Sequence, residues 1–395
     1  MSAPHDAVPG APGPIYMDYG ATTPVDPRVV ASMLPWLAEE FGNPASGGHA
    51  FGWRAQEAVE RARAQVAALV GADPAEIVWT SGATESDNLA LKGALQHEDA
   101  RGRHLVTVVT EHKAVLDAAQ QLARQGCELT LLDVRADGRL DAEHFRDALR
   151  PDTVLASVML VNNEIGVVQD VEALGAICRE RGVLLHVDAA QASGKLAIDL
   201  RRWPVDLMSL TAHKTYGPKG IGALYVRRKP RVKIAAQMHG GGHERGLRSG
   251  TLPTHQCVGM GEAFALAAAE MDAECERMRT LQQRLLQGIE ALGGVRLNGD
   301  RHRRVPHNLN LSFEGVEGRP LLESLPGVAA SSGSACSSAR LEPSHVLRAL
   351  GLRDEQAHAS LRLTIGRFTT EREVDATVQY LHTSVKRLRG RQFPT

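Results

Sequence analysis

Between about residue 24 and residue 260, short runs rich in β-branched residues alternate with longer helical patterns. Strands that alternate with helices of this length are typical of a largely parallel sheet covered by helices on both faces. The run 183–187 is apolar over nearly its whole length, as expected of a strand that is buried on both sides. The sequence therefore predicts an α/β fold with a mostly parallel central sheet. The predicted strands are 77–80, 105–110, 128–132, 154–161, 183–187, 207–210 and 223–226, and the predicted helices are 52–69, 86–95, 114–125, 142–149 and 174–181.

The pattern changes after residue 260. A long segment rich in Ala, Glu, Met and Arg predicts one or two helices over 261–292. The closing helix carries one apolar stripe, because its apolar residues recur at spacings of four and three. We therefore expect a disordered leader over 1–14, a large α/β domain over 15–260, and a small α+β domain over 261–395, on which the first residues of the large domain can pack. The predicted elements of the small domain are strands at 308–313, 328–331 and 360–364, a helix at 344–350, and the closing helix with Val374, Val378, Leu381, Val385 and Leu388.

Composition and charge exclude several classes of function. A chain of 395 residues with 43% hydrophobic residues can bury a sizeable core. The formal net charge is −1, so no overall field attracts nucleic acid or an anionic membrane. Five scattered cysteines do not suggest a disulfide framework, and reduced thiols are expected. No stretch approaches the roughly 20 apolar residues of a membrane span, and the leader lacks the features of a targeting peptide. We expect a cytoplasmic protein that binds neither nucleic acid nor membrane directly.

A strand-to-helix turn near residue 82 is a candidate phosphate site. The predicted strand 77–80 leads through small residues into a helix, whose first turn presents free backbone N–H groups and the positive end of a dipole. Gly82 and Ala83 permit close approach of an anion, and the hydroxyl of Thr84 can add a hydrogen bond. The alternative is that Thr84 and the residues after it only cap the helix. Both interpretations remain open at this point.

An acidic residue ends the buried strand 183–187. Asp188 lies at the carboxyl end of this strand, where open α/β sheets bind ligands. A carboxylate there needs a cationic partner to stay charged, and a protonated pyridine nitrogen would supply one. Gln191, three residues later, could reach a ring hydroxyl. The alternative is that Asp188 only caps the following turn.

A lysine follows the next predicted strand. Lys214 lies about one strand–helix–strand unit after Asp188, so both side chains can reach one crevice. A lysine bonds to an aldehyde only when its amine is neutral, which requires that desolvation or a nearby cation lower its ordinary pKa of about 10.4. Most lysines are simply solvated, but the hydroxyl of Thr211, the ring of His213 and a loop rich in Gly and Pro favour the reactive interpretation. The three elements together predict a site for pyridoxal phosphate.

Cys336 lies in a stretch of Ser, Gly and Ala, residues 331–339, which cannot anchor a loop by burial. The thiolate is the nucleophilic form of cysteine, and the ordinary thiol pKa of about 8.5 means that its proton must be removed. We predict that Cys336 moves between the cofactor and the surface. The remaining cysteines are expected to be small buried hydrophobes: Cys127, Cys178, Cys257 and Cys275.

Many segments of the chain resemble one family in its order of motifs. From about residue 15 to its end, the chain is similar to the cysteine desulfurases, most closely to the iron–sulfur-cluster-assembly type with the longer catalytic loop. The resemblance implies a fold-type-I pyridoxal 5'-phosphate enzyme that is a homodimer with active sites at the subunit interface. The segments that carry it are 17–24, 41–44, 80–88, 110–112, 161–166, 188–191, 213–214 and 331–339.

The resemblance also implies roles for single residues. Lys214 would bond covalently to the cofactor, Asp188 would pair with its pyridine nitrogen, and Gln191 would contact its ring oxygen. His112 would stack on the ring and move protons. Asn163, also counted among the cofactor-binding residues, and Arg362 would bind the substrate carboxylate, for which a planar guanidinium is suited. The phosphate would be held by Ala83, Thr84, Thr211 and His213, with Thr251 supplied by the neighbouring subunit.

The activity that the resemblance implies is conversion of L-cysteine to L-alanine, with the sulfur left on Cys336 as a persulfide. An iron–sulfur scaffold protein would accept the sulfur, with a carrier for tRNA thiolation as a further candidate. No resident metal is expected, although Cys336 is a candidate for transient contact with a nascent cluster. Two departures from the family are Thr211-Ala212, where Ser-Gly is usual, and a short C-terminal tail, which concerns the affinity for the scaffold.

The sequence disfavours two other functions and leaves two open. The pair His239 and His243 is separated by three glycines, which makes a helical zinc site improbable. The chain lacks the G-x-G-x-x-G turn of a nicotinamide dehydrogenase. A selenocysteine lyase on the same scaffold and a non-catalytic assembly protein remain as alternatives, separable by turnover on the two amino acids and by the cofactor's absorbance.

Overall fold

The computed structural model describes residues 13–332 and 343–392. Its centre is a seven-stranded sheet with the order β2-β8-β7-β6-β5-β3-β4. Only β8 runs antiparallel to its neighbours β2 and β7, and the other adjacent pairs are parallel. This confirms the predicted α/β fold with a mostly parallel sheet. The strands are β2 (Ile77–Thr80), β3 (His104–Val108), β4 (Glu128–Leu132), β5 (Thr153–Met159), β6 (Leu184–Asp188), β7 (Leu207–Thr211) and β8 (Gly222–Val226).

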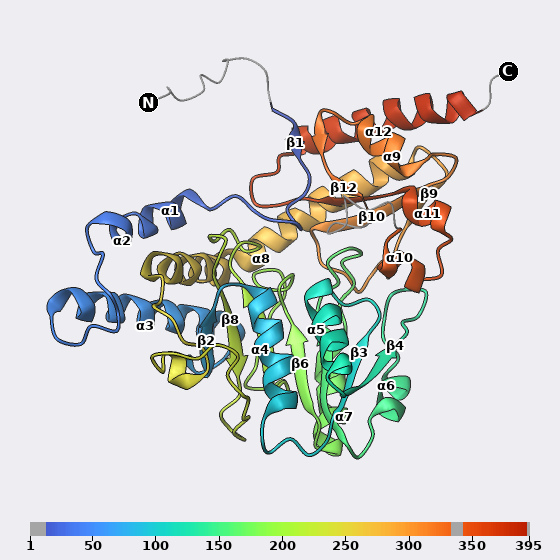
Figure 1. Cartoon of the computed structure of the whole chain (residues 1–395). Helices are drawn as coiled ribbons and strands as arrows, with labels where there is room; N and C mark the ends of the chain where they lie inside the picture. The colour runs from blue at the N-terminus through green and yellow to red at the C-terminus, as the bar shows by residue number, and fades with distance from the viewer. Residues whose placement is uncertain (1–12, 333–342, 393–395) are drawn as a thin grey trace.

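Helices cover both faces of this sheet (Figure 1). Side chains alternate between the two faces along each strand, so every central strand must supply apolar residues to two cores. In β2, Trp79 packs into the core with α3, α6 and α7, whereas Val78 packs into the core with α4 and α5. The helices of this part are α1 (Pro27–Met33), α2 (Pro35–Ala38), α3 (Ala50–Val70), α4 (Ala83–Gln96), α5 (Lys113–Arg124), α6 (Ala142–Ala148) and α7 (Val171–Arg181), with short 3-10 turns at Pro74–Glu76 and Glu244–Gly246.

A single long helix joins the two cores. Helix α8 (Thr254–Glu290) has 37 residues and crosses residue 260 without a break. Its first half buries Met260 and Phe264 against the core of the central sheet. Its second half buries Leu281 and Leu285 in a separate core. The segment predicted as one or two helices is therefore one helix that belongs to both cores.

The second core is built on a four-stranded antiparallel sheet with the order β12-β13-β10-β9. The run predicted as one strand over 328–331 is two strands, because Val328–Ala329 (β11) pairs with Ile15–Tyr16 (β1) and Ser331–Ser332 (β12) pairs with β13. The first described residues thus pack on this second core, where Met17 is fully buried. The remaining elements are β9 (Val295–Leu297), β10 (Asn308–Phe313), β13 (Ser360–Thr364), α9 (Gly318–Glu323), α10 (His345–Ala349), α11 (Asp354–His358) and α12 (Glu371–Gln392).

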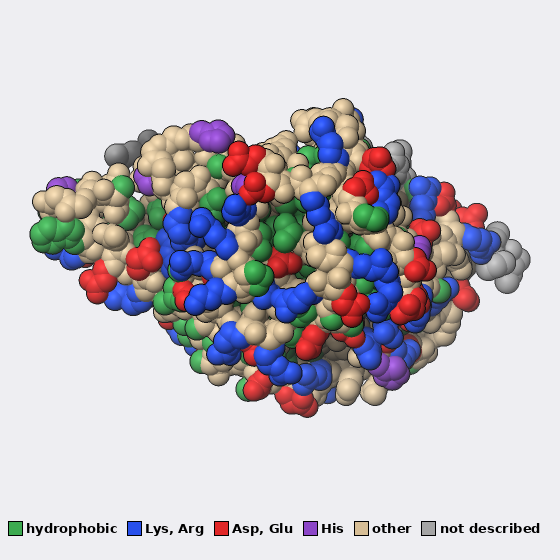
Figure 2. Space-filling model, turned by 90° about the horizontal axis from the view of Figure 1, so that it is seen from below, with side chains coloured by type: hydrophobic (Ala, Val, Ile, Leu, Met, Phe, Trp, Pro, Cys, Tyr) green, Lys and Arg blue, Asp and Glu red, His purple; other side chains and the backbone are tan. Residues whose placement is uncertain are grey.

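Among residues 13–332 and 343–392, no helix combines the length and the apolarity that a membrane span requires. Seen from below, the molecule carries many Lys and Arg side chains with Asp and Glu interspersed among them (Figure 2). Pairs such as Arg150 with Asp152 (2.6 Å) and Lys233 with Asp99 (2.7 Å) balance part of this charge. The mixture agrees with a net charge close to zero.

Of the four cysteines that were predicted to be buried hydrophobes, three are buried. Burial raises the pKa of the thiols of Cys178 and Cys257, which disfavours their reactive thiolate form. Cys275 is buried as well. The prediction was wrong in part for Cys127, which is half-buried because it precedes β4, a strand at the edge of the sheet.

A half-buried arginine connects four segments that are distant in sequence. Arg367, after β13, forms ion pairs with Asp26 at the start of α1 (2.7 Å) and with Glu274 in α8 (2.7 Å). Its guanidinium also lies 4.3 Å from the ring centroid of Tyr216. Bonds to Arg28 and Arg367 hold the pKa of Asp26 well below its usual range.

We predict that Arg367→Ala destabilises the fold by about 1.5–3 kcal/mol, because Glu274 loses the cation it pairs with and Asp26 keeps only its bonds to Arg28. Arg284→Ala is the matched control, since Arg284 forms an exposed pair with Asp375 and its loss should change stability little. Urea denaturation of both variants measures the difference. Equal stabilities of the two variants would contradict the assigned role of Arg367.

Candidate active site

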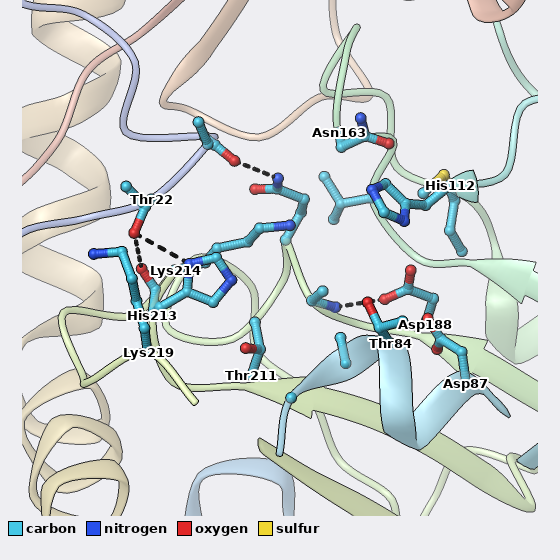
Figure 3. A pocket seen from close by; sticks show the side chains of 18 of the residues that line it. Thr22, Thr84, Asp87, His112, Asn163, Asp188, Thr211, His213, Lys214 and Lys219 are labelled. Atoms are coloured by element: carbon cyan, nitrogen blue, oxygen red, sulfur yellow. Dashed lines mark hydrogen bonds between the residues drawn. The ribbon is translucent and has the colours of Figure 1, made fainter. Parts of the chain in front are cut away.

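A cavity of about 540 Å³ lies at the carboxyl ends of the central strands (Figure 3). Parallel strands end at the same edge of a sheet, so residues that are far apart in sequence meet there. The predicted site residues that line the cavity are Ala83, Thr84, His112, Asn163, Asp188, Gln191, Thr211, His213, Lys214 and Arg362. Thr251 does not line this cavity and is exposed. Cys336 lies outside the described residues.

The turn from β2 into α4 forms one end of the cavity. Gly82 has a φ of 147°, a conformation that L side chains rarely adopt. Gly222 on β8 lies against it, because a Cβ at Gly222 would be 2.6 Å from the Cα of Gly82 and 2.5 Å from the carbonyl oxygen of Leu210. Helix α4 therefore begins directly at the cavity wall, with the backbone N–H groups of its first turn and the Thr84 hydroxyl available to an anion.

His213 lies near this end. Its Nδ1 is 3.1 Å from the hydroxyl of Thr22, which belongs to the segment before α1. Burial and the nearby ammonium of Lys214 lower the pKa of His213 to about 4, so its ring is neutral near pH 7. A neutral imidazole can still donate one hydrogen bond to a phosphate oxygen.

The carboxyl groups of Asp87 and Asp188 line the other end, and a third carboxyl group, that of Glu111, is buried close to them. Asp188, at the end of β6, accepts a hydrogen bond from the backbone N–H of Ala190 (2.9 Å). Asp87 in α4 and Glu111 after β3 are almost fully buried, and burial raises the pKa of both well above the usual range. Within the described residues, neither oxygen of Asp87 and only one oxygen of Glu111 has a hydrogen-bond partner. This end of the cavity therefore favours a cation.

Sequence reasoning missed the roles of Asp87 and Glu111. Both lie inside the segments that carry the family resemblance, 80–88 and 110–112. The available signal was a carboxyl group on the same face of α4 as the apolar residues Ala90, Leu91 and Ala94, and another three residues after a buried strand. Their proximity to Asp188 could not be predicted, because it depends on the order of the strands in the sheet.

A neutral histidine lies beneath the three acids. His186 precedes Asp188 by two residues and therefore shares its face of β6. Its Nδ1 forms a hydrogen bond with the hydroxyl of Ser157 (2.8 Å), and its Nε2 forms one with the hydroxyl of Ser209 (2.9 Å). Nε2 also lies 3.6 Å from Asp87 Oδ1. Burial lowers the pKa of His186 to about 4. The ring therefore supplies no compensating charge near pH 7.

Lys214 lies between the two ends, and its side chain points into the cavity (Figure 3). Its backbone is held from outside the cavity, because the buried ammonium of Lys195 donates to the carbonyl oxygen of Lys214 (2.7 Å). The carbonyl of His213 accepts from the hydroxyl of Thr23 (3.0 Å), and the same hydroxyl accepts from the N–H of Tyr216 (2.9 Å). The lysine is thus fixed at its main chain, while its amine faces the space that a ligand would occupy.

Arg362 occupies the wall beneath the second core and is 1% exposed. Its guanidinium donates to the carbonyl oxygen of Asn163 (2.8 Å), to Asp18 (2.8 Å) and to the hydroxyl of Ser331 (3.3 Å). Its Nε has no hydrogen-bond partner within the described residues. A planar cation held in this way is suited to bind a carboxylate.

Two further residues of the cavity have defined orientations. The amide nitrogen of Gln191 donates to the carbonyl oxygen of Gly20 (2.8 Å). His112 caps α5, because its Nδ1 accepts from the backbone N–H of Ala114 (3.1 Å). Burial, followed by the charge of Lys214, lowers the pKa of His112. The neutral ring therefore carries its proton on Nε2.

The residues of the cavity fit pyridoxal phosphate. A helix N-terminus with hydroxyl groups at one end is suited to a phosphate, and carboxyl groups without partners at the other end are suited to a protonated pyridine nitrogen. A lysine between them can reach an aldehyde on the same ring. No other ligand class considered from the sequence requires all three features.

Three comparisons agree over nearly the whole chain. The family model described as aminotransferase class-V matches residues 15–377. A relative named cysteine desulfurase IscS, from Methylobacillus flagellatus, is 64% identical over 377 residues, which are 95% of this chain and 93% of that protein. A solved structure named NifS-like protein has a TM-score of 0.88 at 35% identity, over 94% of this chain and 99% of its own. A structure described as SspA in complex with cysteine has a TM-score of 0.80 at 37% identity, over 90% and 99%.

We predict that Gly222→Ala destabilises the protein by about 1–3 kcal/mol and reduces the thermal stabilisation by pyridoxal phosphate, because the added methyl group displaces Gly82 or Leu210. Gly47→Ala is the control, since a Cβ there has no neighbour within 4 Å. Melting curves with and without the cofactor measure both effects. A Gly222→Ala protein with unchanged melting and an unchanged cofactor response would contradict this description.

Proposed function

Because this chain belongs to the cysteine desulfurases of the aminotransferase class-V family, we propose that it binds pyridoxal 5'-phosphate at Lys214 and transfers sulfur from L-cysteine to Cys336. The observation that carries the proposal is the placement of Lys214 between an anion-binding helix terminus and a group of buried carboxyl groups in one cavity. The carbon skeleton of L-cysteine is released as L-alanine.

We assign the cofactor contacts as follows. Lys214 holds the cofactor through its aldehyde, Asp188 pairs with the pyridine nitrogen, and Gln191 contacts the ring oxygen. The phosphate is held by Ala83, Thr84, Thr211 and His213, with Thr251 contributed by the neighbouring subunit. When bound, the cofactor withdraws electrons from the substrate and so labilises the bonds at its α-carbon. The threonine at position 211 retains the hydroxyl that the family supplies with serine.

The other residues bind the substrate and move protons. Arg362 and Asn163 bind the carboxylate of L-cysteine, and the bonds of Arg362 to Asp18 and Asn163 keep its guanidinium in place. The amine of Lys214 takes the proton from the α-carbon. His112 can donate or accept a proton at Nε2, because its Nδ1 is occupied by the backbone of α5. One of the similar solved structures is a complex with cysteine, which supports L-cysteine as the substrate.

The sulfur step balances without an external oxidant. The thiolate of Cys336 attacks the sulfur of L-cysteine, so a sulfur–sulfur bond forms and the bond between Cβ and sulfur breaks. The electron pair of the broken bond remains on the carbon skeleton, which takes up a proton and leaves as L-alanine. The transferred sulfur is formally oxidised and the β-carbon is reduced. Cys336 is left as a persulfide.

We propose an iron–sulfur scaffold protein as the main acceptor of this sulfur, because the 64% identical relative is a cysteine desulfurase named IscS. The free thiols of Cys127, Cys178, Cys257 and Cys275 support a reducing compartment, and we propose the cytoplasm.

We also propose that the protein is a homodimer. Large apolar side chains are exposed near α1, α2 and the start of α3, namely Leu34, Leu37, Phe41, Phe51 and Trp53. The rings of Phe41 and Phe51 lie 5.3 Å apart, and the indole of Trp53 donates to the carbonyl of Gly47 (2.7 Å), so the three aromatic side chains of this patch are held in place. An ordered apolar patch of this kind is typical of a protein interface.

We predict that Cys336→Ser abolishes formation of alanine from L-cysteine but keeps the visible absorbance of the bound cofactor, because the serine hydroxyl cannot accept sulfur. Cys127→Ser is the control, since Cys127 is half-buried and remote from the cavity residues, and it should keep wild-type turnover. Alanine assays and absorbance spectra give both results. Normal turnover in Cys336→Ser would contradict the role of Cys336.

We predict that Trp53→Asp shifts the protein from dimer to monomer, because a carboxylate in an apolar contact must be desolvated. Phe368→Asp is the control: it also replaces an exposed aromatic residue, but one that packs on Tyr216 and lies outside the patch. Sedimentation velocity measures the oligomeric state. A dimeric Trp53→Asp protein would show that this patch is not the interface.

A further inference from the structure

The start of α10 is attached to the cavity walls by polar and apolar contacts. This helix is the first one after the segment that contains Cys336, which itself lies outside the described residues. Val346 and Leu347 pack with Ile165 and Val167 in a small buried cluster. Ile165 follows Asn163, which lines the cavity, by two residues. The beginning of α10 is thus in contact with the loop that carries a substrate-binding residue.

A buried carboxyl group makes the first polar attachment. The hydroxyl of Ser344 donates to Glu164 Oε2 and accepts from the backbone N–H of Leu347 (3.1 Å), which caps α10. Glu164 is 4% exposed and directly follows Asn163. Burial raises the pKa of Glu164 to about 7, so keeping this acid inside the protein opposes its ionisation. No step of the proposed reaction uses Glu164.

A histidine makes the second attachment. The Nε2 of His345 donates to the backbone carbonyl oxygen of Glu111 (3.0 Å), and His112, the next residue, lines the cavity. Burial lowers the pKa of His345, which favours the neutral ring. Ser344 is therefore hydrogen-bonded to the residue after Asn163, and His345 to the residue before His112. Both Asn163 and His112 line the cavity.

The chain is also attached on the other side of Cys336. Ser331 in β12 pairs with Arg362 in β13, and its hydroxyl accepts from the guanidinium of Arg362 (3.3 Å). Cys336 lies four residues after Ser332 and eight residues before Ser344. Both described ends of this segment are thus fixed to residues that bind or border the substrate.

We propose that Glu164 and Ser344 are positioning residues that fix the chain after Cys336 to the substrate-binding wall and thereby set the delivery of its thiol to the substrate sulfur. The effective concentration of a tethered group at its target falls when the attachment of its tether is weakened. Loss of the Ser344–Glu164 bond removes one of the contacts that fix the start of α10, whereas the bond of His345 and the apolar packing of the helix remain. The sulfur step then slows, while the residues that bind L-cysteine stay in place. This inference rests on the proposed function.

The test separates positioning from simple support of α10. Ser344→Ala removes both the bond to Glu164 and the helix cap, whereas Glu164→Leu keeps the cap and the side-chain volume but removes the acceptor of the bond. Thr370→Ala is the matched control, because the Thr370 hydroxyl accepts from the N–H of Glu373 (3.2 Å) at the start of α12 and has no part in the cavity. Ser344→Thr keeps the hydroxyl and serves as the rescue variant.

Each variant is loaded with cofactor and mixed with L-cysteine. Binding is followed by the absorbance of the cofactor, and a rapid quench with mass spectrometry follows the gain of one sulfur atom on Cys336. We expect Ser344→Ala and Glu164→Leu to form the persulfide roughly tenfold more slowly, with L-cysteine affinity within about twofold of wild type. Thr370→Ala and Ser344→Thr should form it at the wild-type rate. Thr370→Ala should lower the melting temperature through the loss of a helix cap, and Ser344→Ala should lower it further because it also leaves buried Glu164 without its bond.

The inference is overturned if Ser344→Ala and Glu164→Leu form the persulfide as fast as wild type. It is also overturned if their L-cysteine affinity falls as much as the rate, or if Thr370→Ala slows the transfer equally. Failure of the proposed function gives a different result, because wild type itself would then place no sulfur on Cys336. If Ser344→Ala does not fold, Glu164→Leu still decides the question, because it removes the same bond and keeps the helix cap.

Discussion

The clustering of three carboxyl groups at the closed end of the cavity is the constraint on which the site depends. Asp87 and Glu111 lie in the protein interior beside Asp188, where like charges repel strongly and water cannot screen them. Burial, followed by the charges of neighbouring carboxylates, raises the pKa of Asp87 and of Glu111 and so disfavours their charged forms. Asp188 then remains as the natural partner of a single positive charge. A protonated pyridine nitrogen supplies one charge of that kind, in a flat ring that also reaches Lys214.

The topology of the sheet explains why so many distant residues meet around this charge. Strands β5, β6 and β7 run in the same direction, so the residues that follow them face one edge. The reversed strand β8 brings Gly222 against Gly82 and opens the helix terminus for an anion. Arg362 is supplied by the second core. Helix α8 belongs to both cores, and the network of Arg367 ties them to the segment before α1.

The sequence predicted the elements of the central sheet well, because alternation of short apolar strands with amphipathic helices is a local signal. The segment 328–331 was harder, since its division into β11 and β12 depends on pairing with β1 and β13, which are far away in sequence. For the same reason the direction of β8 was not predicted. Within the site, Lys214 and Asp188 could be identified from motifs. Asp87 and Glu164 could not, because their roles depend on neighbours that only the folded chain provides.

Borohydride reduction of the purified protein, followed by peptide mass spectrometry, tests the central claim most directly. Reduction makes the bond between a lysine and a cofactor aldehyde permanent, so the modified residue can be located in the sequence. If the cavity holds pyridoxal phosphate as proposed, the adduct is found on Lys214 and the visible absorbance is lost. An adduct on another lysine, or a protein that retains no cofactor, would contradict the account.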